Sequence, residues 1–175
     1  MTMATIAHNQ LVEYARSATA SVFSTMLDME VIPKPEHLDQ TPPKITDGVM
    51  ALVGIAGPWI GAGVITCSAR SAIDVCNHLL SADEDSVNDD VLDAVGEVAN
   101  MIIGNIKTMV EEHLGPLCLS IPTVVYGHNF TSRSAGNDNW VVLPFEYGGD
   151  VIAIRICLAP SKSPASMLVA SVHPS

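Results

Sequence analysis

The chain has 175 residues, so we expect one domain over residues 1–160 and a C-terminal tail over residues 161–175. With 19 acidic and 8 basic residues its formal charge is −11, which argues against nucleic acid and anionic membrane surfaces as partners, because both require a basic footprint. Hydrophobic residues make up 48% of the chain, yet no window holds 18 consecutive apolar residues and the first residues do not resemble a secretory leader. We therefore expect a soluble, cytoplasmic protein.

The spacing of apolar residues predicts the first elements in chain order. Helical spacing predicts an amphipathic helix over residues 10–29. Prolines and charges between residues 32 and 47 indicate a surface connection without regular structure. Two strands, over residues 48–56 and 59–67, are predicted to form a hairpin with a turn at Gly57-Pro58.

Two helices follow the hairpin. A short helix is predicted over residues 69–80 and an acidic loop over residues 81–87. A long amphipathic helix is predicted from about residue 88 to residue 113, with Asn88 as its N-cap and Gly115-Pro116 as its end.

The last predicted elements are three strands, over residues 117–126, 140–147 and 151–158. A polar loop over residues 127–139 separates the first two, and Gly148-Gly149 makes a tight turn before the third. This order predicts an α/β protein of the α+β type, with one mostly antiparallel sheet packed against helices.

Cysteine and histidine spacing does not indicate a metal site. The four cysteines form no C-x-x-C pair, and most lie in apolar stretches, so we expect buried free thiols. The six histidines are scattered without a ligand spacing. We therefore expect no metal site in the chain itself.

The long helix carries a polar stripe. At about 100° per residue, Asp93, Glu97, Asn100 and Gly104 fall within an arc of about 60°. The far side is apolar and consists of Leu92, Val95, Val98, Ala99, Ile102, Ile106 and Met109. A solvated helix face has no need of Asn or Gly, which both lower helix stability relative to Ala. The alternative is an ordinary wet face that tolerates two poor helix formers.

The residue pattern of this stripe resembles a known signature. Asp93-x-x-x-Glu97-x-x-Asn100, followed by Met-Ile-Ile-Gly-Asn, resembles the motif of the CheC/CheX/FliY phosphatases of bacterial chemotaxis. The preceding Gly-rich hairpin and helix are also typical of CheX-like chains, and the similarity covers roughly residues 10–158. The helix over residues 10–29 has no second E-x-x-N, so the single-copy CheX type fits best. The resemblance implies a CheC/CheX-like fold and a homodimer.

The resemblance also implies an activity, namely hydrolysis of the aspartyl phosphate on a CheY-like receiver domain of a response regulator. Asn100 would position the attacking water, and Glu97 would bind the receiver's active-site lysine. Asp93 and Gly104 would contact the partner, although helix–sheet packing would explain Gly104 equally well. The chain would need no cofactor of its own, and Mg²⁺ would lie in the receiver's active site.

Two other classes of function stay open at this point. The first is a non-catalytic receiver-binding or switch-type module with the same fold, against which the intact Glu97/Asn100 pair argues. The second is a small-molecule sensor, which only the Gly-rich hairpin favours. That hairpin lacks the lysine of a phosphate loop, so tight strand packing explains its glycines better.

Overall fold

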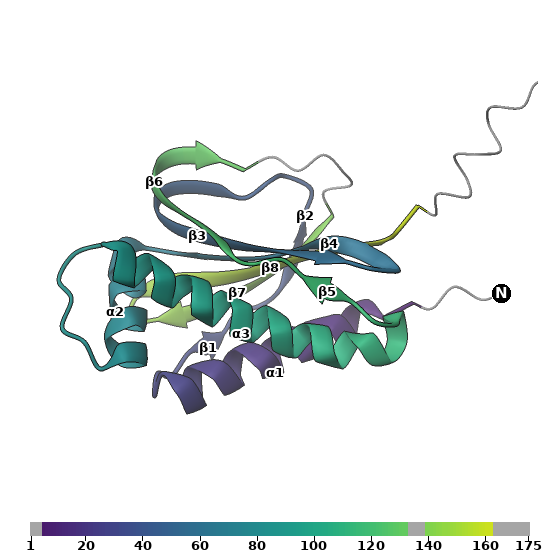
Figure 1. The fold of residues 1–175 in the computed structure, drawn as a ribbon, viewed down its shortest axis with the longest axis horizontal. Coiled ribbons are helices and arrows are strands. Elements are labelled where there is room, and N and C mark those ends of the chain that lie inside the picture. The colour runs from purple at the N-terminus through teal and green to yellow at the C-terminus, as the bar shows by residue number, and fades with distance from the viewer. Residues whose placement is uncertain (1–4, 133–138, 163–175) are drawn as a thin grey trace, which may run out of the picture.

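The computed structural model describes residues 5–132 and 139–162, which form three helices and one sheet (Figure 1). The helices are α1 (His8–Met26), α2 (Ala69–Leu80) and α3 (Asp89–Leu114). The strands are β1 (Ile32–Pro33), β2 (His37–Asp39), β3 (Lys44–Ala56), β4 (Trp59–Cys67), β5 (Cys118–Leu119), β6 (Thr123–Thr131), β7 (Trp140–Tyr147) and β8 (Asp150–Pro160).

All described strand pairs are antiparallel, as the sequence predicts. The sheet has the order β1-β7-β8-β4-β3-β5, and β2 also pairs with β7 while β6 also pairs with β3. The two ends of the sheet are therefore β1 with β2, and β5 with β6. The α+β prediction is confirmed.

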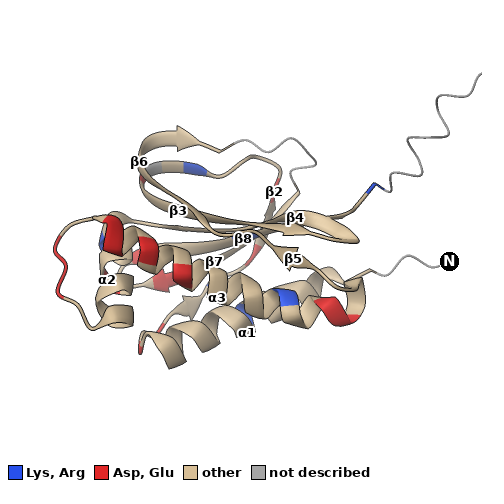
Figure 2. Ribbon diagram, in the orientation of Figure 1, with Lys and Arg blue, Asp and Glu red and all other residues tan. Residues whose placement is uncertain are grey.

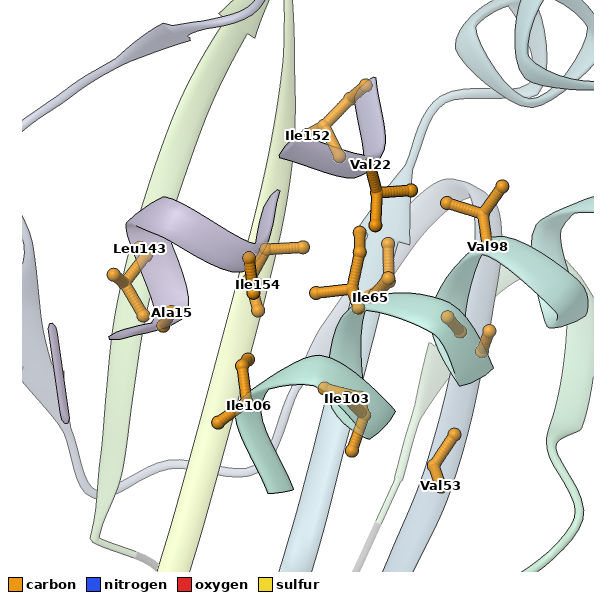
Figure 3. Close-up of a cluster of buried hydrophobic side chains, with 14 of the residues drawn as sticks. Ala15, Val22, Val53, Ile65, Val98, Ile103, Ile106, Leu143, Ile152 and Ile154 are labelled. Carbon is orange, nitrogen blue, oxygen red and sulfur yellow. The ribbon is translucent and has the colours of Figure 1, made fainter. Parts of the chain in front are cut away.

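The main core lies between the helices and one face of the sheet. Figure 3 shows Val98, Ile103 and Ile106 of α3 facing the strands, where Ile65 and Ile154 are almost completely buried. Alternate strand residues point to the opposite face, where a smaller cluster consists of Ile45, Met50, Val64, Trp140 and Val142. Both faces of the central strands are thus covered, which explains why these strands are so apolar.

Local signals predicted several elements well. Helix α2 and strand β4 have the predicted bounds, and the turn between β3 and β4 lies at Gly57-Pro58. Asn88 caps α3, since its Oδ1 accepts a hydrogen bond of 3.0 Å from the Val91 N–H. Gly115, with a φ of 82°, ends the helix in a conformation that favours glycine.

The prediction of an irregular connection over residues 32–47 is wrong. Strands β1 and β2 form there, and β3 already begins at Lys44, ahead of the predicted strand start. Ile32 and Pro33 pair with Glu146 and Phe145 of β7. Proline is tolerated because β1 is a two-residue strand at the end of the sheet. Its missing N–H therefore breaks no hydrogen bond between inner strands.

The predicted strand over residues 117–126 is interrupted. Ile55 pairs with Leu119 and Leu52 pairs with Thr123, so two residues of β3 lie opposite the three residues 120–122. The extra residue is a β-bulge, which separates β5 from β6. Strand β6 then continues to Thr131, into the predicted polar loop, while residues 133–138 of that loop lie outside the described residues. The predicted tail also lies outside them from residue 163 onward.

Cys67, Cys76 and Cys118 are free thiols, as predicted, but not all of the cysteines are buried. Cys67 and Cys76 are buried, Cys157 is half-buried and Cys118 is exposed. Desolvation raises the pKa of Cys67 to about 12, with a smaller contribution from the Asp150 carboxylate. Among the described residues, no helix is both long and apolar enough to cross a membrane.

Candidate functional site

The rotation of α3 about its axis is determined by its apolar side. Ile102 and Ile103 are almost completely buried. Gly63 of β4 permits this contact, because a Cβ there would lie 2.3 Å from the Ile103 Cδ1. Most of the predicted apolar side is buried, while Leu92 and Met109 are half-buried at its margins. The opposite side of the helix therefore faces away from the sheet.

The predicted stripe lies on that outer side. Asp93 and Glu97 are exposed, and Asn100 and Gly104 are half-buried. Within residues 5–132 and 139–162, the side chains of Asp93, Glu97 and Asn100 make no hydrogen bond or ion pair. The fold thus leaves a carboxylate and a carboxamide, three residues apart on one helix face, available to an external molecule.

Glu111, two turns beyond Gly104 on the same side, behaves differently. Its Oε1 accepts a 2.7 Å hydrogen bond from the Leu117 N–H and lies 2.9 Å from the Lys107 Nζ. The Leu117 N–H, followed by the Lys107 side chain, holds the pKa of Glu111 below its ordinary value. Glu111 therefore ties the last turn of α3 to Leu117, the residue before β5, and, unlike Glu97, it already has partners.

The two mid-helix glycines of α3 differ in their surroundings. A Cβ at Gly96 would lie 3.1 Å from the Val124 Cγ2 and 3.6 Å from the Pro122 Cβ, so β6 packs closely there. A Cβ at Gly104 would meet no atom within 4 Å. Helix–sheet packing accounts for Gly96 and not for Gly104, which excludes one of the two explanations that the sequence leaves open for Gly104.

Two residues beside the stripe are absent from the sequence prediction. Gly96 is one. The other is Ile121, which is 86% exposed in the bulge between β5 and β6 and is followed by Pro122, whose Cβ approaches Gly96. Pro122 indicates a break in the predicted strand, but nothing local shows that the break lies beside α3. The described residues contain no group of three or more potential metal-ligating side chains.

An exposed carboxylate can bind a cation, and a half-buried carboxamide beside it can orient a water molecule. The region that contains them matches the family model "Chemotaxis phosphatase CheX" over residues 49–146, more than half of the chain. The chain belongs to this family. That assignment agrees with the signature, since Asp93, Glu97 and Asn100 all lie inside the matched region.

A curated relative is the "CheY-P phosphatase CheX" of Thermotoga maritima, which is 30% identical over 95 residues. The match covers 53% of this chain and 61% of the relative, so the chain spans less than two thirds of that protein.

Solved structures share the fold. The chemotaxis protein CheX from Desulfovibrio desulfuricans has a TM-score of 0.76 at 28% identity, covering 85% of this chain and 99% of that one. CheX in the CheX–CheY–BeF₃–Mg²⁺ complex from Borrelia burgdorferi has a TM-score of 0.71 at 24% identity, covering 85% and 97%. Together these structures confirm the predicted CheC/CheX-like fold.

The surroundings of Gly104 predict a stability effect. Gly104→Ala should raise the free energy of unfolding by up to about 1 kcal/mol, because Ala is the better helix former and its Cβ meets no atom. Gly96→Ala, the matched control, should gain less or lose stability, because its Cβ must displace Val124. Urea denaturation measures both. A destabilised Gly104→Ala variant would contradict the open surface above this glycine.

Proposed function

We propose that this protein is a phosphatase that hydrolyses the aspartyl phosphate of a CheY-like response regulator. The observation that carries the proposal is the pair Glu97 and Asn100, exposed or half-exposed, without partners in the described structure, and inside the region that matches the CheX family. The name of the Thermotoga maritima relative and the Borrelia burgdorferi complex with CheY support it.

The chemistry demands little of the enzyme. An aspartyl phosphate is an acyl phosphate and is already reactive toward water, so a phosphatase must chiefly hold a water molecule in line with the bond that breaks. In this proposal the receiver supplies Mg²⁺ and a lysine, which stabilise the charge on the transferring phosphoryl group. The chain itself then needs no cofactor.

Asn100 is assigned the role of positioning this water. A carboxamide accepts a hydrogen bond through its oxygen and donates through its nitrogen, so it can orient a water molecule from two sides. A strong base is unnecessary because the transition state is loose. No partner within the described residues holds the Asn100 side chain, so it is free to contact water.

Glu97 is assigned to docking. It lies about one turn before Asn100 on the same face, and its carboxylate would form a charge-assisted hydrogen bond with the receiver's lysine. Asp93 would contact the partner or orient Glu97. Gly104, with open space around it, would let a loop of the receiver approach the helix.

The deciding experiment measures the decay of a phosphorylated receiver with and without the protein, across a panel of the host's receivers. Faster decay supports the proposal. A receiver that binds without faster decay would support the non-catalytic module instead. The sensor alternative has lost its support, because the hairpin glycines Gly61 and Gly63 are occupied by contacts with β8 and α3.

Replacing Asn100 separates catalysis from binding. Asn100→Ala should lower the rate of dephosphorylation 100-fold or more, because the water loses its orientation. Receiver affinity should hardly change, and helix stability should rise by a few tenths of a kcal/mol, because Ala is the better helix former. Single-turnover decay of the phospho-receiver and thermal melts measure these effects.

The matched control for this variant is Asn105→Ala. Asn105 is an exposed asparagine on the same helix but off the stripe, so its replacement should leave the rate unchanged. A destabilised Asn100→Ala variant with normal activity per folded molecule would show that Asn100 is a structural anchor.

Replacing Glu97 tests docking. Glu97→Ala should weaken binding to the activated receiver by about 1.5–3 kcal/mol, because it removes a hydrogen bond to a charged group. Glu97→Lys should weaken it further through repulsion. The melting temperature should change little, since the side chain is exposed. Isothermal titration calorimetry with Glu112→Ala as an exposed glutamate control measures this, and unaltered affinity would remove Glu97 from the interface.

The proposal includes a cytoplasmic homodimer. Strand β6 lies at one end of the sheet, and its outer side pairs with no other strand in the described part of the chain. Such an edge can pair with a second copy. Light scattering after size-exclusion chromatography should give twice the monomer mass, and a monomer mass at micromolar concentrations would exclude a stable dimer. Cell fractionation tests the cytoplasmic location.

A further inference from the structure

Ile121 has the most exposed large hydrophobic side chain of the described residues, at 86%, followed by Leu38 at 68%. A single exposed apolar residue is common on protein surfaces and carries no conclusion alone. Ile121 differs from such a residue in the cause of its outward direction, in the order of its backbone and in its position near α3.

The β-bulge turns Ile121 away from the core. Leu117 and Leu119 both contribute to the main core, so regular alternation would point Ile121 inward as well. The extra residue in the segment 120–122 shifts the alternation by one, and Val124 is the next side chain to pack against the core. A bulge that re-aims a side chain is a device typical of functional sites.

The bulge is firmly held. The Ser120 N–H donates to the Gly54 carbonyl oxygen at 2.9 Å, and the Gly54 N–H donates to the Ser120 Oγ at 2.8 Å. The Ser120 hydroxyl also donates to the Ile121 carbonyl oxygen at 2.9 Å, and Pro122 restricts the next φ angle. Ile121 is therefore presented by an ordered backbone, which lowers the entropy lost when a partner covers it.

The bulge lies beside the stripe. The closest approach is at Gly96, where a Cβ would lie 3.6 Å from the Pro122 Cβ. Gly96 immediately precedes Glu97 and lies about one helical turn before Asn100. The bulge at residues 120–122 therefore packs against the turn of α3 that carries Glu97 and Asn100.

The stripe itself offers a partner only polar contacts, so an apolar residue beside it could add binding energy. The charged contact proposed for Glu97 gives orientation and specificity as well as affinity. A few side chains that the partner covers completely carry much of the binding energy of an interface, and the contacts around them exclude water. The exposed Ile121 lies in the bulge whose Pro122 packs against Gly96, the residue before Glu97.

We infer that Ile121 is an affinity-determining residue for the receiver, which covers this side chain when Glu97 and Asn100 reach its phosphorylation site. The inference rests on the proposed function and adds to it a binding residue outside the signature. It adds affinity from the bulge to the docking contact of Glu97 and leaves the positioning of water to Asn100. The receiver surface next to the phosphorylated aspartate must accordingly present an apolar patch.

The test separates KM from kcat. Ile121→Ala removes three carbon atoms from the contact and should raise KM for the phospho-receiver about 10- to 50-fold, with kcat unchanged. Ile121→Leu should stay within about threefold of the unmodified protein, because it preserves the apolar volume. The Kd for a receiver activated with beryllium fluoride and Mg²⁺ should follow KM, and the melting temperature should not change.

The matched control is Ile32→Ala. Ile32 is 53% exposed and lies in β1, at the opposite end of the sheet from β5. The Ile32→Ala substitution should leave KM, kcat and Kd unchanged. If Ile121→Ala dephosphorylates the receiver with unaltered KM, the inference fails while the proposed function stands. If the unmodified protein neither binds nor dephosphorylates any receiver, both fail together.

Discussion

The packing of α3 on the sheet determines the geometry of the whole site. Ile103 fits above Gly63, and the neighbouring buried residues of the helix leave no room for another rotation about its axis. Because side chains on a helix follow a fixed period, burying one side determines which residues face outward. The position of Glu97 and Asn100 is therefore a consequence of hydrophobic packing on the far side, although neither residue contributes to that packing.

The second constraint is the close approach of β6 to the same helix. Gly96 and the bulge at residues 120–122 together bring a strand connection level with the stripe. A larger residue at position 96 would have to displace Val124. The site thus combines a helix face, which carries the polar groups, with a sheet edge, which carries an apolar group. Both elements are held by contacts outside the site, so the proposed partner would meet an ordered surface.

Sequence patterns predicted the parts of the fold that depend on local interactions. The Asn88 cap, the α2 helix and the turn at Gly57-Pro58 each follow from a few neighbouring residues. The short strands β1 and β2 did not, because their pairing with β7 joins residues about 100 positions apart and leaves no alternation in a two- or three-residue strand. The bulge was missed for the same reason, since its hydrogen bonds are made with Gly54.

The site shows the same division. The signature identified the helix face that carries Glu97 and Asn100, and the structure exposes that face. Ile121 was beyond prediction because Leu117, Leu119 and Ile121 alternate as in a regular strand, which predicts an inward side chain. Such disagreement between a local pattern and the final structure is expected most often where function constrains the chain.

Electrostatics gives a reason for the order of residues along the stripe. The helix dipole stabilises acids in the first turn, where Asp89 and Asp90 lie, but its effect is small at Asp93 and Glu97. Figure 2 shows acidic residues gathered around the beginning of α3. Asp93 and Glu97 are four residues apart, and like charges at this spacing repel by about 0.2–0.5 kcal/mol.

In the proposed complex a lysine of the receiver would offset this repulsion, so the repulsion in the free protein would favour its binding. The third position of the stripe requires the opposite property. A carboxylate at position 100 would repel the phosphoryl oxygens that this cation accompanies, whereas a carboxamide of nearly the same shape is neutral and still binds water. The charged Glu97 would thus face the cation of the proposed partner, and the neutral Asn100, one turn later, would face its anionic phosphoryl group.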